Sequence, residues 1–197
     1  MRKAFVFDFD DTLAVTDATI RVFRDCQPWS ERFVASLTPQ EFSSYELKTG
    51  EHFDFSEFRD ERFIKNADPT FLMHLAQEVS EEDQDVYILT AREDDSADAI
   101  QSFLANYNVS AKTIHCVGGT KETIPQKKKE MLLTIMQKYD KIYYYDDSSD
   151  NIEGAPEGDE AAAAAHRREL HQVRHRPVRG RRQHRRLREH HRRGAAA

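Results

Sequence analysis

The sequence predicts an α/β fold in which a parallel sheet lies between two layers of helices, with a small flap or cap inserted after the first strand. Short apolar segments alternate with segments of helical period, which is typical of parallel strands joined by right-handed crossovers. Two of the apolar segments, 4–8 and 142–146, end in paired carboxylates. Residues 17–68 break the alternation and are dense in Phe and Tyr, so a hairpin and loops are expected there.

Four segments are expected to form strands, because each is short, apolar and rich in β-branched or aromatic residues. They are Ala4–Asp8, Val86–Thr90, Thr113–Val117 and Ile142–Asp146. Three helices are expected from apolar faces, the first with Asp68 as N-cap and Pro69 as its first residue, and the third with Pro125 near its start. These faces are Leu72, Leu75 and Val79; Ala97, Ile100, Leu104 and Tyr107; and Leu132, Ile135, Met136 and Tyr139.

The first strand runs directly into three carboxylates, Asp8, Asp10 and Asp11. In an extended chain the side chains of Asp8 and Asp10 point the same way, and like charges so close need a cation or a shared proton. Mg²⁺ prefers such hard oxygen ligands. At this spacing Asp8 can act as a nucleophile and Asp10 as a general acid and base. A calcium loop would need Gly where Leu13 stands, which leaves a solvated acidic turn as the alternative.

Two further segments carry groups that suit a phosphate. Thr90 ends the second strand, where a hydroxyl and the following backbone N–H groups can hold phosphate oxygens, and Arg92 could add a planar cationic contact. Lys127, Lys128 and Lys129 lie in the first turn of the third predicted helix, where a cation opposes the helix dipole. At least one of them is therefore expected to serve a ligand, with Lys128 favoured and Lys127 next.

The last predicted strand ends in a second pair of carboxylates, Asp146 and Asp147, with Asp150 and Asn151 one turn later. In an open α/β sheet, ligands bind at the carboxyl ends of the strands. This pair would therefore supply further ligands to a metal held at the end of the first strand.

The motifs occur in the order of a known family: Asp8, Asp10 and Thr12, then Thr90, then Lys128, then Asp146, Asp147 and Asp150. This order resembles the haloacid dehalogenase (HAD) superfamily over residues 3–155, and two Asp residues in the first motif are similar to its phosphatase branch. Small phage and bacterial HAD hydrolases look most similar. The resemblance implies a HAD-like Rossmannoid three-layer sandwich that hydrolyses phosphomonoesters with Mg²⁺ through a phospho-aspartate.

The resemblance also implies a role for each motif residue. Asp8 would be the nucleophile and Asp10 the acid and base. Mg²⁺ would be held by Asp8, the Asp10 carbonyl and Asp147, with support from Asp146 and Asp150. Thr90 and Lys128 would hold the phosphoryl group, and the substrate-binding set is completed by Thr12, Arg92 and Lys127.

Two other functions stay open, a receiver-like signalling module and an inactive phosphate-binding module. A receiver uses similar groups in a different order, with the acidic pair first, and would be phosphorylated in a burst without turnover. The substrate is open among nucleotides, nucleic-acid 3′-phosphate ends, sugar phosphates and phosphoproteins. The expected partner is thus a phosphorylated small molecule or a nucleic-acid end, and no membrane.

Composition divides the 197 residues into a core, 1–155, with its insert at about 17–68, and a tail, 156–197. The net charge of −6 hides a basic tail, since residues 161–197 contain 12 Arg and two acidic residues. This Ala/Arg/His tail is expected to be disordered and could contact nucleic acid non-specifically. The composition changes abruptly after Gly154, which suggests a replaced C-terminus. Two distant cysteines, no long apolar run and no leader before the first strand favour a cytoplasmic protein.

Overall fold

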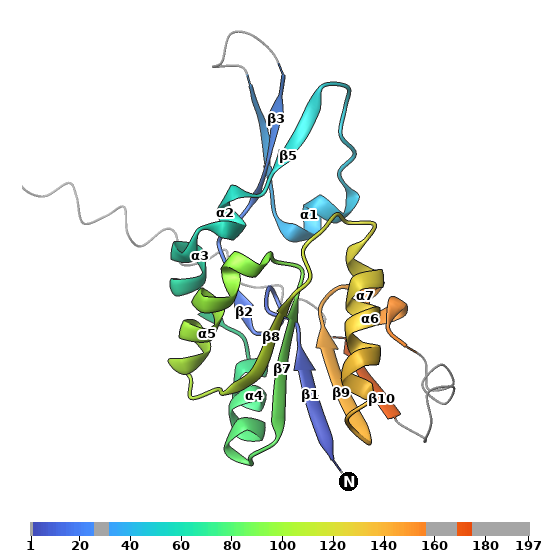
Figure 1. Cartoon of the computed structure of the whole chain (residues 1–197). Helices are drawn as coiled ribbons and strands as arrows, with labels where there is room; N and C mark the ends of the chain where they lie inside the picture. The colour runs from blue at the N-terminus through green and yellow to red at the C-terminus, as the bar shows by residue number, and fades with distance from the viewer. Residues whose placement is uncertain (1, 26–31, 157–168, 175–197) are drawn as a thin grey trace, which may run out of the picture.

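The computed structural model describes residues 2–25, 32–156 and 169–174. Its centre is a parallel sheet of five strands in the order β10-β9-β1-β7-β8, shown in Figure 1. The strands are β1 (Lys3–Phe7), β7 (Asp85–Thr90), β8 (Ala111–Cys116), β9 (Lys141–Asp146) and β10 (Glu169–Arg174). The four expected strands are all present, and the predicted fold class, a parallel sheet between helical layers with a small cap, is confirmed.

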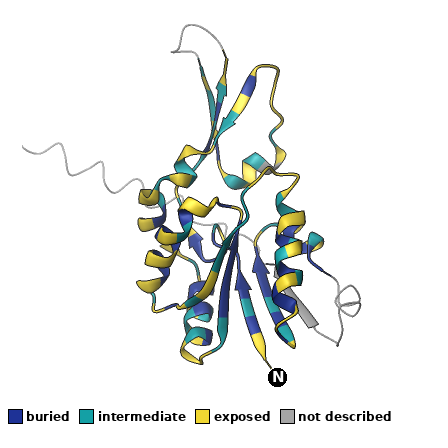
Figure 2. Ribbon diagram, viewed as in Figure 1, coloured by how far each residue is buried: buried dark blue, intermediate teal, exposed yellow. Residues whose placement is uncertain are grey.

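Helices cover both faces of the sheet (Figures 1 and 2). Side chains alternate along β1, so that Phe7 joins one apolar cluster while Ala4 and Val6 join the other. The first cluster includes buried residues of α4 (Leu72–Glu81) and α5 (Ala97–Ala105), and the second includes those of α6 (Ile124–Met136) and α7 (Ser149–Gly154). In the described part of the chain, no helix combines the length and the apolar character needed to cross a bilayer.

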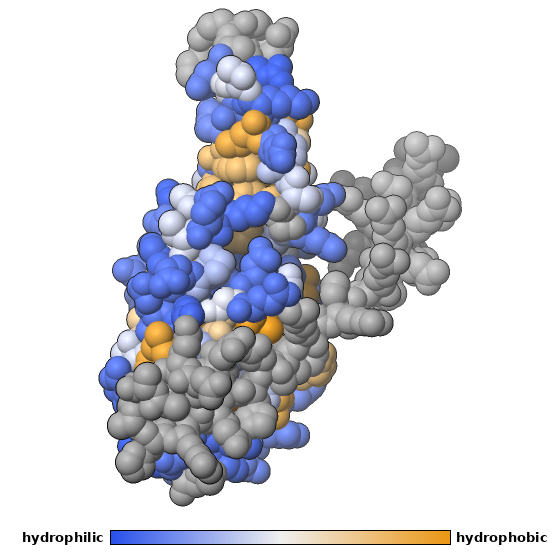
Figure 3. All heavy atoms as spheres, turned by 90° about the vertical axis from the view of Figure 1, so that its right-hand side faces the viewer, coloured by the Kyte–Doolittle hydropathy of each residue, from blue (hydrophilic) through white to orange (hydrophobic). Residues whose placement is uncertain are grey.

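The insert forms a cap above the carboxyl ends of the strands (Figure 1). Its three antiparallel strands lie in the order β4-β3-β5 and pack around Ile20, Val22 and Leu37. Seen from the side, the cap carries an apolar area between hydrophilic ones (Figure 3). Its elements are β3 (Ile20–Arg24), β4 (Phe33–Leu37), α1 (Pro39–Ser44), β5 (Glu51–Asp54), α2 (Ser56–Arg59) and α3 (Glu61–Lys65). The cap is therefore a small sheet with short helices rather than a hairpin with loops.

The expected start of the first helix is wrong. Asp68 and Pro69 form the short strand β6, which pairs antiparallel with β2 (Ala14–Val15), and α4 begins at Leu72. The backbone N–H of Thr70 donates to the carbonyl of Leu13. The segment that leaves the core for the cap thus pairs with the segment that returns, and this long-range pairing overrides the local capping pattern.

The tail also differs from the expectation where it is described. Glu169–Arg174 form β10, which pairs parallel to β9 with Glu169 opposite Lys141 and Arg174 opposite Asp146. An open strand edge presents unpaired backbone groups that another segment can satisfy, which composition alone does not reveal. The rest of the expected disordered tail, residues 157–168 and 175–197, lies outside the described residues, as does Cys26.

Candidate active site

Three carboxylates meet where β1 and β9 end. Asp8 follows β1 directly, and its backbone N–H donates to the carbonyl of Tyr145 in β9. Asp146 is the last residue of β9, and Asp147 comes next. Asp8, Asp146 and Asp147 each place a carboxylate oxygen within 4.8 Å of the others. The side-by-side parallel strands therefore bring together two motifs that lie more than a hundred positions apart.

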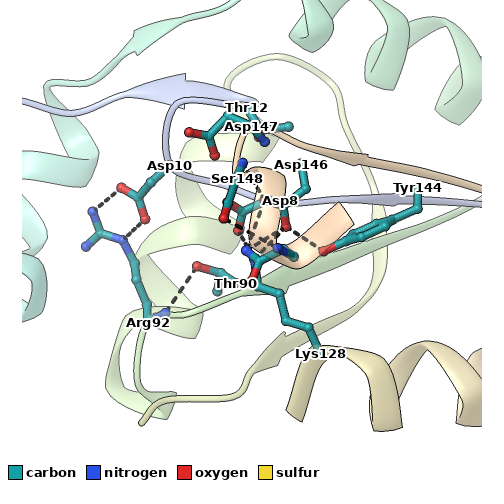
Figure 4. A network of polar contacts seen from close by, with 11 residues as sticks. Asp8, Asp10, Thr12, Thr90, Arg92, Lys128, Tyr144, Asp146, Asp147 and Ser148 are labelled. Atoms are coloured by element: carbon teal, nitrogen blue, oxygen red, sulfur yellow. Dashed lines mark hydrogen bonds and ion pairs between the residues drawn. The ribbon is translucent and has the colours of Figure 1, made fainter. Parts of the chain in front are cut away.

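Lys128 lies between two of these carboxylates (Figure 4). Its Nζ is 2.8 Å from Asp146 Oδ2 and 3.0 Å from Asp8 Oδ1, and its side chain is 1% exposed. Burial alone would lower the pKa of Lys128, but attraction to Asp146 and Asp8 outweighs it and raises the pKa. The ammonium group thus stays charged and partly neutralises the cluster.

Asp146 is held by a set of neutral donors, of which the sequence patterns named only Asn151. Tyr144 Oη donates to Oδ2, and Asn151 Nδ2 donates to Oδ1 and Oδ2 at 3.0 and 3.2 Å. The backbone N–H of Ser148 adds a bond of 3.0 Å to Oδ1. The signals were present, because Tyr144 stands two residues before Asp146 on the same side of the strand, and Asn151 lies on the first turn of α7. These donors fix Asp146 in one orientation.

One oxygen of Asp8 lies in an ion pair but accepts no hydrogen bond. Asp8 is 7% exposed, and its Oδ1 lies 3.0 Å from the ammonium group of Lys128 without a hydrogen bond to it. Burial raises the pKa of Asp8 well above its usual range; Lys128 opposes this shift, and repulsion from Asp146, Asp147 and Asp10 adds to it. Three carboxylates lie close to the ammonium group of Lys128, so a further cation or a proton is needed to balance their charge.

Asp147 points in the same way to a missing positive charge. Asp147 is exposed at the surface, but partial desolvation, together with repulsion from Asp146 and Asp11, raises the pKa of Asp147 to about 7. Mg²⁺ binds through one or two carboxylates and keeps several waters. Asp8 and Asp147, with Asp146 beside them, therefore fit a Mg²⁺ ion.

A tight turn after β1 joins the two motifs. Asp11 has φ +55°, and the backbone N–H groups of Leu13 and Ala14 both donate to the carbonyl of Phe9. A left-handed residue that is not glycine is often found at functional sites. The turn buries Thr12, whose Oγ1 accepts from the backbone N–H of Asp147 at 3.1 Å. Thr12 thus fixes the Asp147 backbone, and any contact of Thr12 with phosphate stays a prediction.

Thr90 and Arg92 lie at the end of β7, both buried. Thr90 Oγ1 accepts from the backbone N–H of Arg92 at 3.2 Å, which places the hydroxyl at the strand end as expected. The guanidinium group of Arg92 does not point to the Asp8 cluster but binds both oxygens of Asp10 (Figure 4). Asp10 is therefore paired with Arg92, and its carboxylate is not part of the group formed by Asp8, Asp146 and Asp147.

Two other predicted site residues lie apart from the cluster. Lys127 is exposed, and its Nζ donates to the carbonyls of Val117 and Gly118. Asp150 is exposed on α7 and is not in the carboxylate group. Their predicted roles at phosphate and metal would each require a rearrangement.

Comparison with known proteins assigns no family and no function to this chain. No family model and no curated protein matches the chain. Among solved structures, the chain is similar to the HAD domain of effector protein Lem4 from Legionella pneumophila, with 14% identity, a TM-score of 0.49, and coverage of 91% of this chain and 88% of that one. It is also similar to a HAD-superfamily hydrolase, subfamily IA, variant 1, from Geobacter sulfurreducens, with 12% identity, a TM-score of 0.45, and coverage of 83% and 86%.

The fold is HAD-like. The described chain has the Rossmannoid parallel sheet, with β1 between the other two motif strands β7 and β9, and a cap inserted after β1. A fold of this kind supports many functions. What this chain does must therefore be inferred from its own side chains.

Proposed function

We propose that the protein is a Mg²⁺-dependent phosphomonoester hydrolase that works through a phospho-aspartate on Asp8. The observation that carries the proposal is the buried Oδ1 of Asp8, which accepts no hydrogen bond although it lies in an ion pair with Lys128, within a group of three carboxylates. A structural carboxylate would be expected to have its oxygens satisfied. A carboxylate oxygen that accepts no hydrogen bond is available to attack a bound substrate as a nucleophile.

Asp8, Asp147 and the neighbouring Asp146 would hold the Mg²⁺ ion, which when bound supplies charge stabilisation for the phosphoryl oxygens. Lys128 keeps a positive charge beside Asp8, so that an anionic phosphate can approach a cluster of carboxylates. Tyr144 and Asn151 hold Asp146, which in turn orients Lys128. Thr90 offers a hydroxyl at the neighbouring strand end.

Attack by an Asp8 oxygen on phosphorus would form the phospho-aspartate and break the bond to the leaving oxygen. Asp10 would give that oxygen a proton and then take one from the water that attacks phosphorus in the second step. In this structure Asp10 is held by Arg92, so this role requires the carboxylate to turn.

The side chains of the cap favour a substrate with a planar group, such as a nucleotide or a nucleic-acid 3′-phosphate end. A groove on the cap combines aromatic and cationic side chains, and aromatic faces can stack on a base. Its lining is Phe23, Arg32, His52, Phe53, Asp54, Phe55 and Arg59.

The test is a screen of nucleotides, 3′-phosphorylated oligonucleotides, sugar phosphates and phosphopeptides, with Mg²⁺ and with EDTA. Hydrolysis that needs Mg²⁺ and disappears in Asp8→Asn is expected, because an amide is a poor nucleophile and does not balance the metal charge. Undiminished activity in Asp8→Asn would refute the proposal. Phosphorylation in a burst without turnover would instead favour the receiver-like module, and phosphate binding alone the inactive one.

A further inference from the structure

Arg92 makes three side-chain hydrogen bonds that link two parts of the molecule. Its Nε and Nη2 donate to Oδ2 and Oδ1 of Asp10 at 2.8 and 2.7 Å. Its Nη1 donates at 2.5 Å to the backbone carbonyl of Phe58, which lies in the cap helix α2. One guanidinium group thus holds the carboxylate of Asp10 in the core and a backbone carbonyl of the cap.

The guanidinium group has little freedom in this arrangement. The Arg92 side chain is 1% exposed, and its Cζ lies 5.7 Å from the ring centre of Phe9 and 5.0 Å from that of Phe58. Its backbone is fixed as well, because the N–H donates to Thr90 Oγ1 and the carbonyl accepts from the N–H of Gly118. The pair with Asp10 is partly buried, and a bidentate arginine–carboxylate pair is strong and specific in geometry.

The contact to the cap is reinforced by a neighbour. Ser96 Oγ also donates to the carbonyl of Phe58, at 3.4 Å. On the other side of the pair, Thr16 Oγ1 donates to Asp10 Oδ1 at 3.2 Å, and Thr16 lies on the segment that runs from β2 toward the cap. Asp10 is therefore held by the residue that binds the cap helix and by the segment that leads to the cap.

We propose that Arg92 is a positioning residue that ties the carboxylate of Asp10 to the cap helix α2, so that the cap and the general acid/base move together. This inference rests on the proposed function of Asp10. Both Asp10 oxygens are occupied by Arg92, so at least one of the two hydrogen bonds must break before Asp10 can reach a leaving oxygen. A shift of α2 moves the Phe58 carbonyl that holds Nη1 and thereby turns the guanidinium group. One Asp10 oxygen is then freed from its hydrogen bond, while the hydrogen bond to the other oxygen keeps Asp10 in place.

This arrangement sets the order of events. With α2 seated as described, Asp10 is turned to Arg92 and does not face Asp8 (Figure 4). A substrate that engages the cap displaces α2 and turns Asp10, still held by one hydrogen bond from Arg92, toward the phosphoryl group. In a substrate-free site, water next to Asp8 is therefore not in reach of Asp10, the proposed acid/base.

The experiment compares Arg92→Met and Arg92→Lys with a matched control, Arg62→Met. Arg62 lies on the neighbouring cap helix α3, its side chain is 83% exposed, and it pairs with Asp60. Each variant is assayed with Mg²⁺ for the rate at which the leaving group is released in the first turnover, before the phospho-aspartate is hydrolysed. The two substrates are an aryl phosphate, whose leaving group needs no proton, and an alkyl phosphate, whose leaving group does.

Arg92→Met should lower the first-turnover rate of leaving-group release by about 10²-fold on the alkyl phosphate, within the usual contribution of general acid–base help, and by less than about threefold on the aryl phosphate. Arg92→Lys should recover part of the loss, because an ammonium group can hold one Asp10 oxygen but not the whole fork. KM should change little. Equal losses on the two substrates would mean a merely structural role and would overturn the proposal, as would unchanged rates on both.

The link to the cap is measured without substrate, by hydrogen exchange of the backbone amides of α2. Loss of the charged hydrogen bond to Phe58 should speed their exchange by about tenfold in Arg92→Met, and Arg62→Met should leave the exchange unchanged. Unchanged exchange in Arg92→Met would overturn the tie to the cap. If the wild type hydrolyses no phosphomonoester, the proposed function fails, and the exchange experiment still decides whether Arg92 holds α2.

Discussion

Lys128 Nζ lies 2.8 Å from Asp146 Oδ2, in a pair whose two side chains are 1% and 0% exposed. The same nitrogen lies 3.0 Å from Asp8 Oδ1. Helix α6 therefore supplies one buried positive charge to two buried carboxylates that come from adjacent strands. Removing one member of a buried ion pair leaves an uncompensated charge, which costs more than the pair itself contributes.

Lys128→Met should accordingly destabilise the protein by about 3–5 kcal/mol. The measurement is urea unfolding in EDTA, followed by circular dichroism. Lys127→Met is the matched control, since Lys127 is exposed and contacts two backbone carbonyls, so its loss should cost less than about 1 kcal/mol. Equal effects of the two substitutions would contradict the buried ion pair.

Asn151→Ala should weaken Mg²⁺ binding by about 10–100-fold, the usual effect of removing a group that orients a metal ligand. Asn151 donates to both oxygens of Asp146 and so holds the carboxylate beside the proposed metal. Calorimetric titration with Mg²⁺, without substrate, measures the affinity.

Asp150→Ala is the control for Asn151→Ala, because Asp150 is exposed and outside the carboxylate group. Its affinity should stay close to that of the wild type. A loss as large as that of Asn151→Ala would instead place Asp150 among the groups that support the metal, as the family resemblance implies.

The pH dependence of stability should change when Asp147 is replaced by Asn. The pKa of Asp147 is about 7 in the folded protein against a usual 3.8, so the folded state retains a proton that the unfolded state releases. The contribution of Asp147 to stability is then fully present below pH 3.8 and is lost as the pH rises through about 7. In EDTA, the Tm of the wild type should fall relative to Asp147→Asn across this range.

Added Mg²⁺ should reverse that fall in the wild type, because the cation stabilises the ionised carboxylate, and should do less in Asp147→Asn. Thermal melts at matched ionic strength provide the comparison. A Tm difference that is constant with pH would show that Asp147 titrates normally in the folded protein.

A chain that ends at Glu160 should retain its reaction but lose stability. Truncation removes β10 and leaves the outer edge of β9 unpaired, while every motif residue stays in place. Thermal melting and hydrolysis of an aryl phosphate measure the two effects. Loss of activity in a truncated chain that remains folded would show that the tail takes part in the site.

Local patterns predicted the strands and the cluster well because both depend on short-range features. Apolar runs mark β1, β7, β8 and β9, and the carboxylates follow two of these runs directly. The same patterns misplaced the start of α4, since the pairing of β2 with β6 is a contact between distant segments. They also missed β10, whose pairing depends on the open edge of β9.

The sequence by itself determined which carboxylates, hydroxyls and lysines stand at strand ends, because strand period and hydrophobicity are local properties of the chain. Only the tertiary structure decided how these groups are paired. Arg92, expected to contact a phosphate, donates hydrogen bonds to Asp10 and to the cap. Lys128 lies between Asp8 and Asp146. The choice of partner for a charged side chain depends on distance, orientation and burial across the whole fold, and no spacing along the chain encodes these.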